Sequence, residues 1–415
     1  MSFTVGFPGT KGSLQGFDRR IWILFYGRIA TAAGFCLAIP FLSLYLHNEL
    51  GITMSVVGLV LLVATLIGSM GQIVGGELAD RYGRRRVMLL GLAWRAVAFL
   101  LISFAIGAGA DYLLLAGLIT LSSFGGSMFD PASNAMIADV VEPSKRLEAY
   151  SFLRIAQNIG WALGPMIGGI LTIWVSFSTL FLLGSIATLG VTVFLYLYIE
   201  ESLRPGQATQ RFSLRDIGHV TSDRTFMTYC MVSILLFIMF GQMSSTYAVF
   251  STDTLGLSTP EVGYLWAWNG LLVIVLQFPI ARWVSPYKMS SVMAFGALLY
   301  AVGYGITGYA TGFLFLLMNM TIITFGEMVV SPAAMNLTAN MSPENERGRY
   351  MGVFGLFSSI GFSMGPFVGG VIMDSVTQND VLMWAAIGSF GVLAALGYWF
   401  LGRRLSAQKN SAVGA

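Results

Sequence analysis

The chain contains little charge for its length. Only 10% of its 415 residues are Asp, Glu, Lys or Arg, whereas 56% are hydrophobic, and the mean hydropathy is +0.74. A soluble core of ordinary size cannot bury so many apolar side chains, so the composition argues against a soluble enzyme. Most of the apolar runs reach the roughly 20 residues that cross about 30 Å of hydrocarbon, which predicts a polytopic membrane protein.

Cysteine and histidine are scarce, with two residues of each. Cys36 and Cys230 lie in apolar segments of different halves, so we expect inert packing residues rather than a disulfide. His219 lies in a polar interval, where we expect a solvated side chain. The sequence has no nucleotide-binding loop, metal-ligand cluster or nucleophile constellation. We therefore expect no enzyme activity, no cofactor, no metal and no nucleic-acid partner.

Polar breaks divide the apolar sequence into twelve segments long enough to be membrane helices. We expect these helices at 21–46, 55–78, 87–107, 112–139, 147–172, 176–199, 225–250, 260–284, 288–309, 312–340, 347–373 and 380–402.

Lysine and arginine are missing from alternate loops. With a cytoplasmic N-terminus, 20 of the 23 Lys and Arg residues fall on the cytoplasmic side, and the other three, Arg28, Arg95 and Arg154, lie within helices. Cytoplasmic loops of membrane proteins carry an excess of such residues. The pattern predicts an all-α integral protein of the plasma (inner) membrane, with twelve transmembrane helices and both termini in the cytoplasm.

The two halves of the chain are related by an internal repeat. Residues 159–171 match residues 360–372 at an offset of 201, and Asp130-Pro131 falls on Ser331-Pro332 at the same offset. Such repeats typify transporters built from two similar bundles, with the substrate site between them. The expected parts are a cytoplasmic segment 1–20, six-helix bundles 21–199 and 225–402, a linker 200–224 with a short amphipathic helix, and a tail 403–415.

A charged run at residues 76–88 separates the second and third predicted helices. Gly76 and Gly83 give the backbone freedom for a sharp turn, and four arginines keep the run out of lipid. This run, called here the signature loop, is therefore expected to be a cytoplasmic hairpin.

The signature loop resembles the G-x-L-A-D-R-x-G-R-R motif of the major facilitator superfamily, and the fifth predicted helix resembles a motif of its drug:proton antiporter branch. The matching residues are Gly76, Asp80, Arg81, Gly83, Arg84 and Arg85 in the loop, and Gly160, Gly164, Pro165, Gly168 and Gly169 in the helix. The resemblance implies two rocking bundles and export. We expect the glycines of the fifth and eleventh helices to make close contacts at the interface that rocks.

The resemblance also implies a latch at the signature loop. Asp80 would dock at the cytoplasmic start of the eleventh helix, and Arg84 would reach Asp139. Both contacts would exist only when the cytoplasmic side is shut, so the latch would favour the outward-facing state.

Few ionisable residues lie deep in the predicted helices, where each needs a partner, a wet cavity or a role. In the N-terminal half, Asp130 can pair with Arg154 or Arg28 beside the cavity, which would leave positive charge for an anionic substrate group. The alternative is a static ion network that holds helices together.

Glu327 lies near the middle of the tenth predicted helix, without a charged neighbour at that depth in its half. A carboxyl in low dielectric holds a proton and releases it when water or a cation arrives, so proton and cationic substrate can compete for it. The alternative is a permanently protonated Glu that bonds a neighbouring helix. Asp130 is the second candidate for proton coupling.

Aromatic and amide side chains in the fifth, seventh and eighth helices are candidates for lining a cavity suited to amphipathic compounds. They are Asn158, Trp161, Gln242, Tyr247, Trp268 and Asn269.

These residues predict a monomeric secondary transporter that uses the proton gradient to export amphipathic or cationic small molecules by alternating access. A carrier of lipids or anionic metabolites that uses Arg28 and Arg154 is the alternative. A receptor or channel with the same fold is a third hypothesis, and nothing in the sequence supports an appended signalling domain. The expected partners are protons, the substrate and the lipid bilayer.

Overall fold

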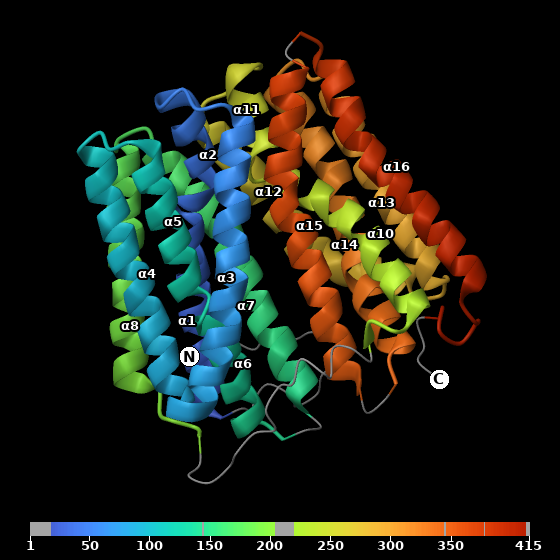
Figure 1. Cartoon of the computed structure of the whole chain (residues 1–415), viewed down its shortest axis with the longest axis horizontal. Helices are drawn as coiled ribbons and strands as arrows, with labels where there is room; N and C mark the ends of the chain where they lie inside the picture. Colours follow the sequence, from blue (N-terminus) through green and yellow to red (C-terminus); the bar gives the residue numbers. More distant parts are fainter. Residues whose placement is uncertain (1–17, 143–144, 204–219, 344–345, 377, 412–415) are drawn as a thin grey trace.

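The computed structural model describes residues 18–142, 145–203, 220–343, 346–376 and 378–411, which form long helices and no strand (Figure 1). The helices are α1 (Arg19–Cys36), the short turns η2 (Ile39–Phe41), α2 (Leu42–Leu44) and η3 (Tyr45–Glu49), α3 (Met54–Tyr82), α4 (Arg84–Gly107), α5 (Tyr112–Gly126), α6 (Phe129–Val140), α7 (Arg146–Leu171), α8 (Phe177–Tyr198), α10 (Arg224–Gln242), α11 (Thr246–Asp253), α12 (Thr259–Val284), α13 (Met289–Thr307), α14 (Phe313–Met341), α15 (Arg347–Ser375) and α16 (Asp380–Arg404).

All twelve predicted helices are present among the described residues. Three of them are broken: the first continues beyond α1 as η2, α2 and η3, the fourth is divided into α5 and α6, and the seventh into α10 and α11. Eleven of the helices are apolar enough to span a membrane by composition alone. The remaining predicted helix, α7, is not among these eleven, and it carries Arg154, Gln157 and Asn158.

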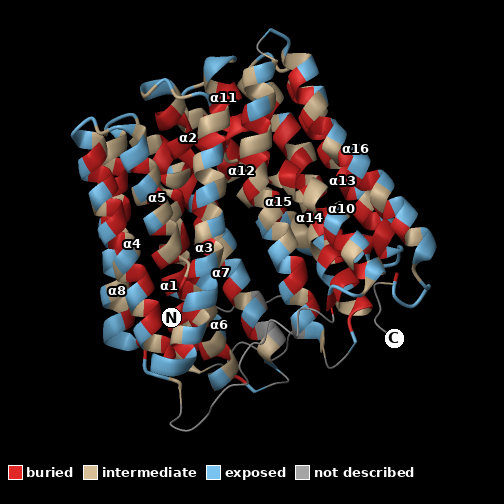
Figure 2. Ribbon diagram, viewed as in Figure 1, coloured by how far each residue is buried: buried red, intermediate tan, exposed pale blue. Residues whose placement is uncertain are grey.

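The helices form two bundles, α1 to α8 and α10 to α16 (Figure 1). Buried residues lie inside each bundle and exposed residues lie on the outer faces, as Figure 2 shows. Many of the exposed residues are large and apolar. Phe104 is 67% exposed and Trp174 is 70% exposed. A water-soluble surface does not carry so much exposed apolar area, so these outer faces suit contact with lipid. The predicted linker helix falls largely on 204–219, outside the described residues.

The bundles touch at the end opposite the signature loop. There, α3 packs on α15 and α7 packs on α12. A Cβ atom on Gly58, the fifth residue of α3, would lie 2.3 Å from the carbonyl oxygen of Pro366, and one on Gly263, the fifth residue of α12, would lie 2.7 Å from that of Pro165. The two contacts therefore repeat one geometry, in which glycine lets the helix backbones approach.

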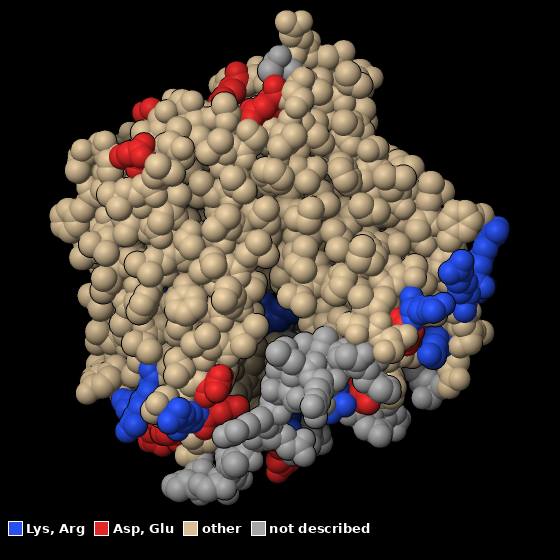
Figure 3. All heavy atoms as spheres, in the orientation of Figure 1, with Lys and Arg blue, Asp and Glu red and all other residues tan. Residues whose placement is uncertain are grey.

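At the signature-loop end the bundles diverge, and Figure 3 shows a hollow between them with Lys or Arg atoms inside. This hollow is called here the cleft. Figure 3 also shows that, on this face, the Lys and Arg atoms lie toward the signature-loop end, whereas the charged atoms at the opposite end are all Asp or Glu. The structure is thus closed at one end and open at the other. With the predicted orientation, it faces inward.

Candidate functional site

Glu327 lies at the centre of α14, on the side that faces α12. Its Oε2 accepts a hydrogen bond of 3.0 Å from Asn269 Nδ2 of α12. The same amide nitrogen donates at 3.0 Å to Thr324 Oγ1, so both of its hydrogens are used. The other carboxylate oxygen, Oε1, has no hydrogen-bond partner among the described residues, which leaves it available to a proton or a bound cation.

Arg154 crosses from the N-terminal bundle to the helix that carries Glu327. Its NH2 group donates a hydrogen bond of 2.6 Å to Ser331 Oγ. Ser331 follows Glu327 by four residues, so both lie on one face of α14, one turn apart. Arg154 is exposed in the cleft and has no carboxylate partner within the part of the chain that the structure describes. Its positive charge therefore stands close to Glu327 across the boundary between the bundles.

Asp130 pairs with Arg28, one of the two predicted partners, at 2.7 Å. Arg28 also donates to Ser133 Oγ at 3.4 Å and to Gln157 Oε1 at 3.3 Å, and its guanidinium lies 5.9 Å from the Phe129 ring centre. The Arg28 side chain is 10% exposed and that of Asp130 is 44% exposed. The expected cluster of Arg28 and Arg154 is thus divided, because Arg28 is neutralised within its bundle and Arg154 is not.

Four of the six predicted cavity residues lie on α7 and α12, two helices of different bundles that pack on each other. Asn158 is exposed and Trp161 is half-buried on α7, and Asn269 bonds Glu327. Trp268 Nε1 donates to Thr321 Oγ1 of α14 at 2.9 Å. Among these four, Asn269 is therefore the residue that contacts the carboxyl of Glu327, whereas Trp268 lines an apolar pocket with the exposed Leu271 and Ile274.

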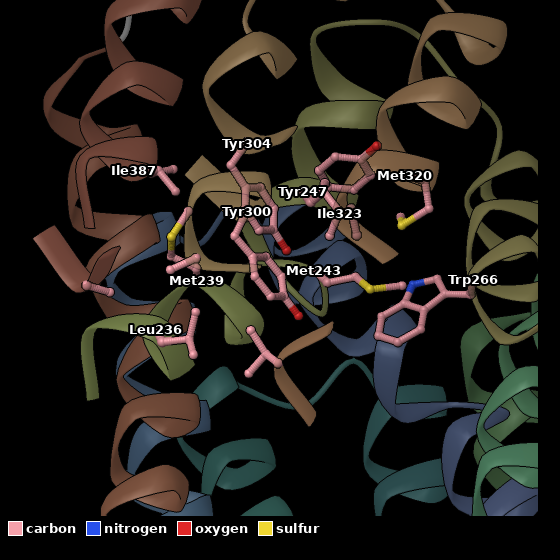
Figure 4. Packing of buried hydrophobic residues seen from close by; sticks show 14 of the residues in the cluster. Leu236, Met239, Met243, Tyr247, Trp266, Tyr300, Tyr304, Met320, Ile323 and Ile387 are labelled. Carbon is pink, nitrogen blue, oxygen red and sulfur yellow. The ribbon is translucent and has the colours of Figure 1, made fainter. Parts of the chain in front are cut away.

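The structure does not place Gln242 and Tyr247 at the cleft. Both are buried inside the C-terminal bundle. Gln242 Nε2 donates to the carbonyl of Gly365 at 2.9 Å, and Tyr247 lies among packed aromatics that include Tyr304 (Figure 4). Their residue types suited a cavity, but the break between α10 and α11 turns these side chains into the bundle.

Ser331 was not singled out from the sequence as a functional residue, since a lone serine in an apolar helix is unremarkable. Its signal was the repeat, in which Ser331 occupies the position of Asp130. In the structure each of the two receives an arginine, Asp130 from its own bundle and Ser331 from the other. The two positions related by the repeat thus each bind an arginine side chain.

The signature loop is fixed within the N-terminal bundle. Arg84 is buried, contacts Asp80 and donates from Nε to Asp139 Oδ2 at 3.2 Å. Gly83 has a φ of 107°, a conformation that favours glycine, and a Cβ there would lie 2.3 Å from Glu201 Oε2. Glu201 in turn accepts the backbone N–H of Arg84 at 2.8 Å. Sequence reasoning missed Glu201, which lies far along the chain from the motif.

One detail of the predicted latch is corrected. Asp80 pairs with Arg84 one helical turn away, and its docking at the start of α15, expected only in the closed state, stays a prediction because the bundles diverge at this end. The contact between Arg84 and Asp139 is present although the same end is open. It therefore does not require the closed state. Two other arginines of the loop stack on rings: Arg81 lies 5.2 Å from the Tyr82 ring centre and Arg85 lies 5.1 Å from that of Tyr196.

The glycines of α7 and α15 face two different directions. A Cβ on Gly160, Gly164 or Gly168 would meet α1 or the residue that follows it, and the repeat-related Gly361, Gly365 and Gly369 face α10. Only the neighbouring Gly169 and Gly370 face the other bundle, toward Thr259 and Met54. The regularly spaced glycines thus pack helices within a bundle, which corrects the expectation that they form the rocking interface.

Known transporters resemble this chain in sequence and in fold. An uncharacterized MFS-type transporter, YttB, of Bacillus subtilis (strain 168) is 30% identical over 86% of this chain and 89% of its own length. A Na⁺, Li⁺, K⁺/H⁺ antiporter of Planococcus maritimus is 27% identical over 94% and 97% of the two chains. The multidrug resistance protein MdtH of Yersinia enterocolitica is 26% identical over 92% and 94%.

Solved structures share the fold. A crystal structure of the nucleoside transporter NupG superposes with a TM-score of 0.79 at 13% identity, covering 92% of this chain and 99% of that one. A POT family transporter in complex with 5-aminolevulinic acid gives a TM-score of 0.78 at 13% identity, covering 94% and 99%. A sequence profile of the Major Facilitator Superfamily matches residues 24–287 and 242–414. The chain is thus a multi-pass membrane transporter that belongs to the major facilitator superfamily.

Proposed function

We propose that this transporter is a proton-coupled antiporter that exports amphipathic or cationic small molecules, with Glu327 as the coupling acid. Its carboxyl bonds Asn269 through one oxygen, and its other oxygen has no hydrogen-bond partner among the described residues. A carboxylate in surroundings of low polarity can be neutralised by one proton or by one cationic group. Competition between the two at one site yields exchange of proton for substrate.

The observation that carries this proposal is the bond of Arg154 to Ser331, one helical turn from Glu327. Because Arg154 belongs to the N-terminal bundle, its distance from Glu327 must change when the bundles rock. The charge beside the carboxyl therefore depends on which way the transporter faces. Such a link between conformation and protonation is what alternating access requires of an antiporter.

The names of two relatives are consistent with this proposal, since one is a multidrug resistance protein and the other a cation/H⁺ antiporter. With the predicted orientation, the open end of the cleft faces the cytoplasm, where an exporter collects its substrate. Trp268, which precedes Asn269 and lines an apolar pocket, offers an aromatic face for the hydrophobic part of an amphipathic compound.

The test is a substrate panel in proteoliposomes that contain a pH-sensitive dye. Lipophilic cations should move protons in the opposite direction to their own transport, and matched neutral and anionic compounds should not. Inorganic K⁺ and Na⁺ belong to the panel because they also are cations. Proton movement driven by the anionic compounds, and not by the cations, would contradict the proposal.

A second candidate function is a carrier of anionic metabolites or lipids that uses Arg154. The supporting observation is that Arg154 is exposed and, among the described residues, bonds a neutral hydroxyl and no carboxylate, whereas Arg28 is already paired with Asp130. The two functions differ in their response to substitution. Anion transport would be lost in Arg154→Ala and kept in Glu327→Gln, and cation export would show the reverse order of sensitivity.

A further inference from the structure

The two bundles are joined by a histidine–carboxylate contact at the end opposite the signature loop. His47 lies in η3, which ends the first transmembrane helix, and Asp253 ends α11. His47 Nε2 lies 3.1 Å from Asp253 Oδ2. Asn48 Nδ2 donates to the other carboxylate oxygen at 2.7 Å. The carboxylate of one bundle is therefore held by two consecutive side chains of the other.

The bonding of His47 requires two ring protons. Its Nδ1 lies 2.6 Å from the carbonyl oxygen of Ile52, which can only accept a hydrogen bond. Its Nε2 faces the carboxylate of Asp253, which accepts when ionised. A neutral imidazole carries one N–H and can satisfy only one of these acceptors. The contact as built is thus an imidazolium paired with a carboxylate.

Other ionisable groups near His47 are acidic or phenolic. Asp374, at the end of α15, accepts the backbone N–H groups of Met54 and Ser55 at 3.1 and 2.7 Å and so joins α15 to the start of α3. Tyr45 and Glu49 share η3 with His47. The loops at this end contain no lysine or arginine in the sequence. Loss of the proton from His47 therefore leaves Asp253 without any cationic partner nearby.

We propose that His47 and Asp253 form a proton-operated clasp, closed when His47 binds a proton and released when the proton leaves. Both side chains are partly accessible, with 27% and 30% of their surface exposed, so protons can exchange with the solution at this end. Histidine is the side chain whose charge changes between about pH 5 and 8. An acidic medium at this end would close the clasp, and a more alkaline one would let the bundles separate.

The pH response of the clasp does not depend on the proposed antiport. Only its role in transport rests on that proposed function. In the predicted orientation this end faces outward, so the acidic outer side that loads Glu327 with a proton would also favour closure behind it. The clasp would thus be a second proton site, separate from the coupling acid.

The experiment measures the distance between the bundles at this end as a function of pH. Spin labels are placed by Ala108→Cys, after α4, and Thr311→Cys, after α13, in a chain whose two native cysteines are replaced. Both sites lie on exposed loop residues of different bundles. Electron–electron distance measurements at pH 5 to 9 report the fraction of molecules closed at this end.

We expect the ratio of closed to open molecules to fall about three- to tenfold as the pH rises through the histidine range, as suits one partly exposed charge-assisted contact. His47→Gln should abolish this dependence, and His47→Arg should keep the closed fraction high at every pH. His219→Gln, which changes the other histidine of the chain, is the matched control and should behave like the parent.

The same measurement in a Glu327→Gln background separates the clasp from the antiport. A pH response that persists there and disappears in His47→Gln supports the clasp whatever the transport assay shows. A parent protein whose distances do not change with pH would overturn the proposal. So would a His47→Gln variant that keeps the full pH response.

Discussion

Gly370→Ala should open the transporter at the end opposite the signature loop. Gly370 lies on α15, and a Cβ atom there would be 2.1 Å from the carbonyl oxygen of Met54 on α3, in the other bundle. Ordinary contact requires well over 3 Å, so α3 and α15 must move apart by about 1 Å or more. The same movement lengthens the bonds from Asp374 to the backbone N–H groups of Met54 and Ser55.

The size of the effect follows from the cost of overpacking. Inserting a methyl group into a closely packed contact costs about 1–3 kcal/mol. Because the strained contact exists only in the state closed at this end, the cost applies to that state alone. The ratio of closed to open molecules should therefore fall about 5- to 150-fold. The labelled pair at residues 108 and 311 would report this as a shift to longer distances.

Two alanine variants on the same helix serve as controls. Gly355→Ala makes no contact within 4 Å and should leave the distances unchanged. Gly365→Ala meets Ile238 and Gly241 of its own bundle, so it should lower the melting temperature without favouring the open state. A Gly370→Ala distance distribution identical to that of Gly355→Ala would refute the assignment of this contact to the interface between the bundles.

Further predictions concern the N-terminal bundle. Gly83→Ala forces a residue with a side chain into a φ of 107° beside Glu201, so it should destabilise the protein by about 1–3 kcal/mol, seen as a lower melting temperature in detergent than for Gly190→Ala, which meets nothing within 4 Å. Asp130→Ala leaves the Arg28 guanidinium without its carboxylate and should cost about 1–3 kcal/mol, whereas the double variant with Arg28→Ala should recover part of that loss. Purely additive effects of the two substitutions would contradict the ion pair as a coupled unit.

The sequence predicted the number and course of the helices well, because a bilayer imposes the length and apolarity that hydropathy measures. The segment 55–78, for example, became α3 (Met54–Tyr82). Hydropathy does not report breaks in the backbone within an apolar run. The interruption between α10 and α11 was therefore missed, and with it the burial of Gln242 and Tyr247.

The candidate site was predicted in part. Charged residues in lipid are conspicuous, so Arg28, Asp130 and Arg154 were found, but the sequence could not choose the partner of Asp130. The choice depends on which faces of α1 and α7 turn toward α6, and small residues such as Gly160 and Gly164 set those faces. Neutral partners such as Ser331 and Glu201 acquire their roles only from tertiary packing.

The central claim is that a proton and a cationic substrate compete for the carboxyl of Glu327. The most direct measurement is the proton released or taken up when a lipophilic cation is added to proteoliposomes, compared among the parent, Glu327→Asp and Glu327→Gln. The account predicts substrate-driven proton exchange in the parent, weakened exchange in Glu327→Asp, and none in Glu327→Gln although that protein is folded by its melting temperature. Undiminished proton exchange in Glu327→Gln would contradict it.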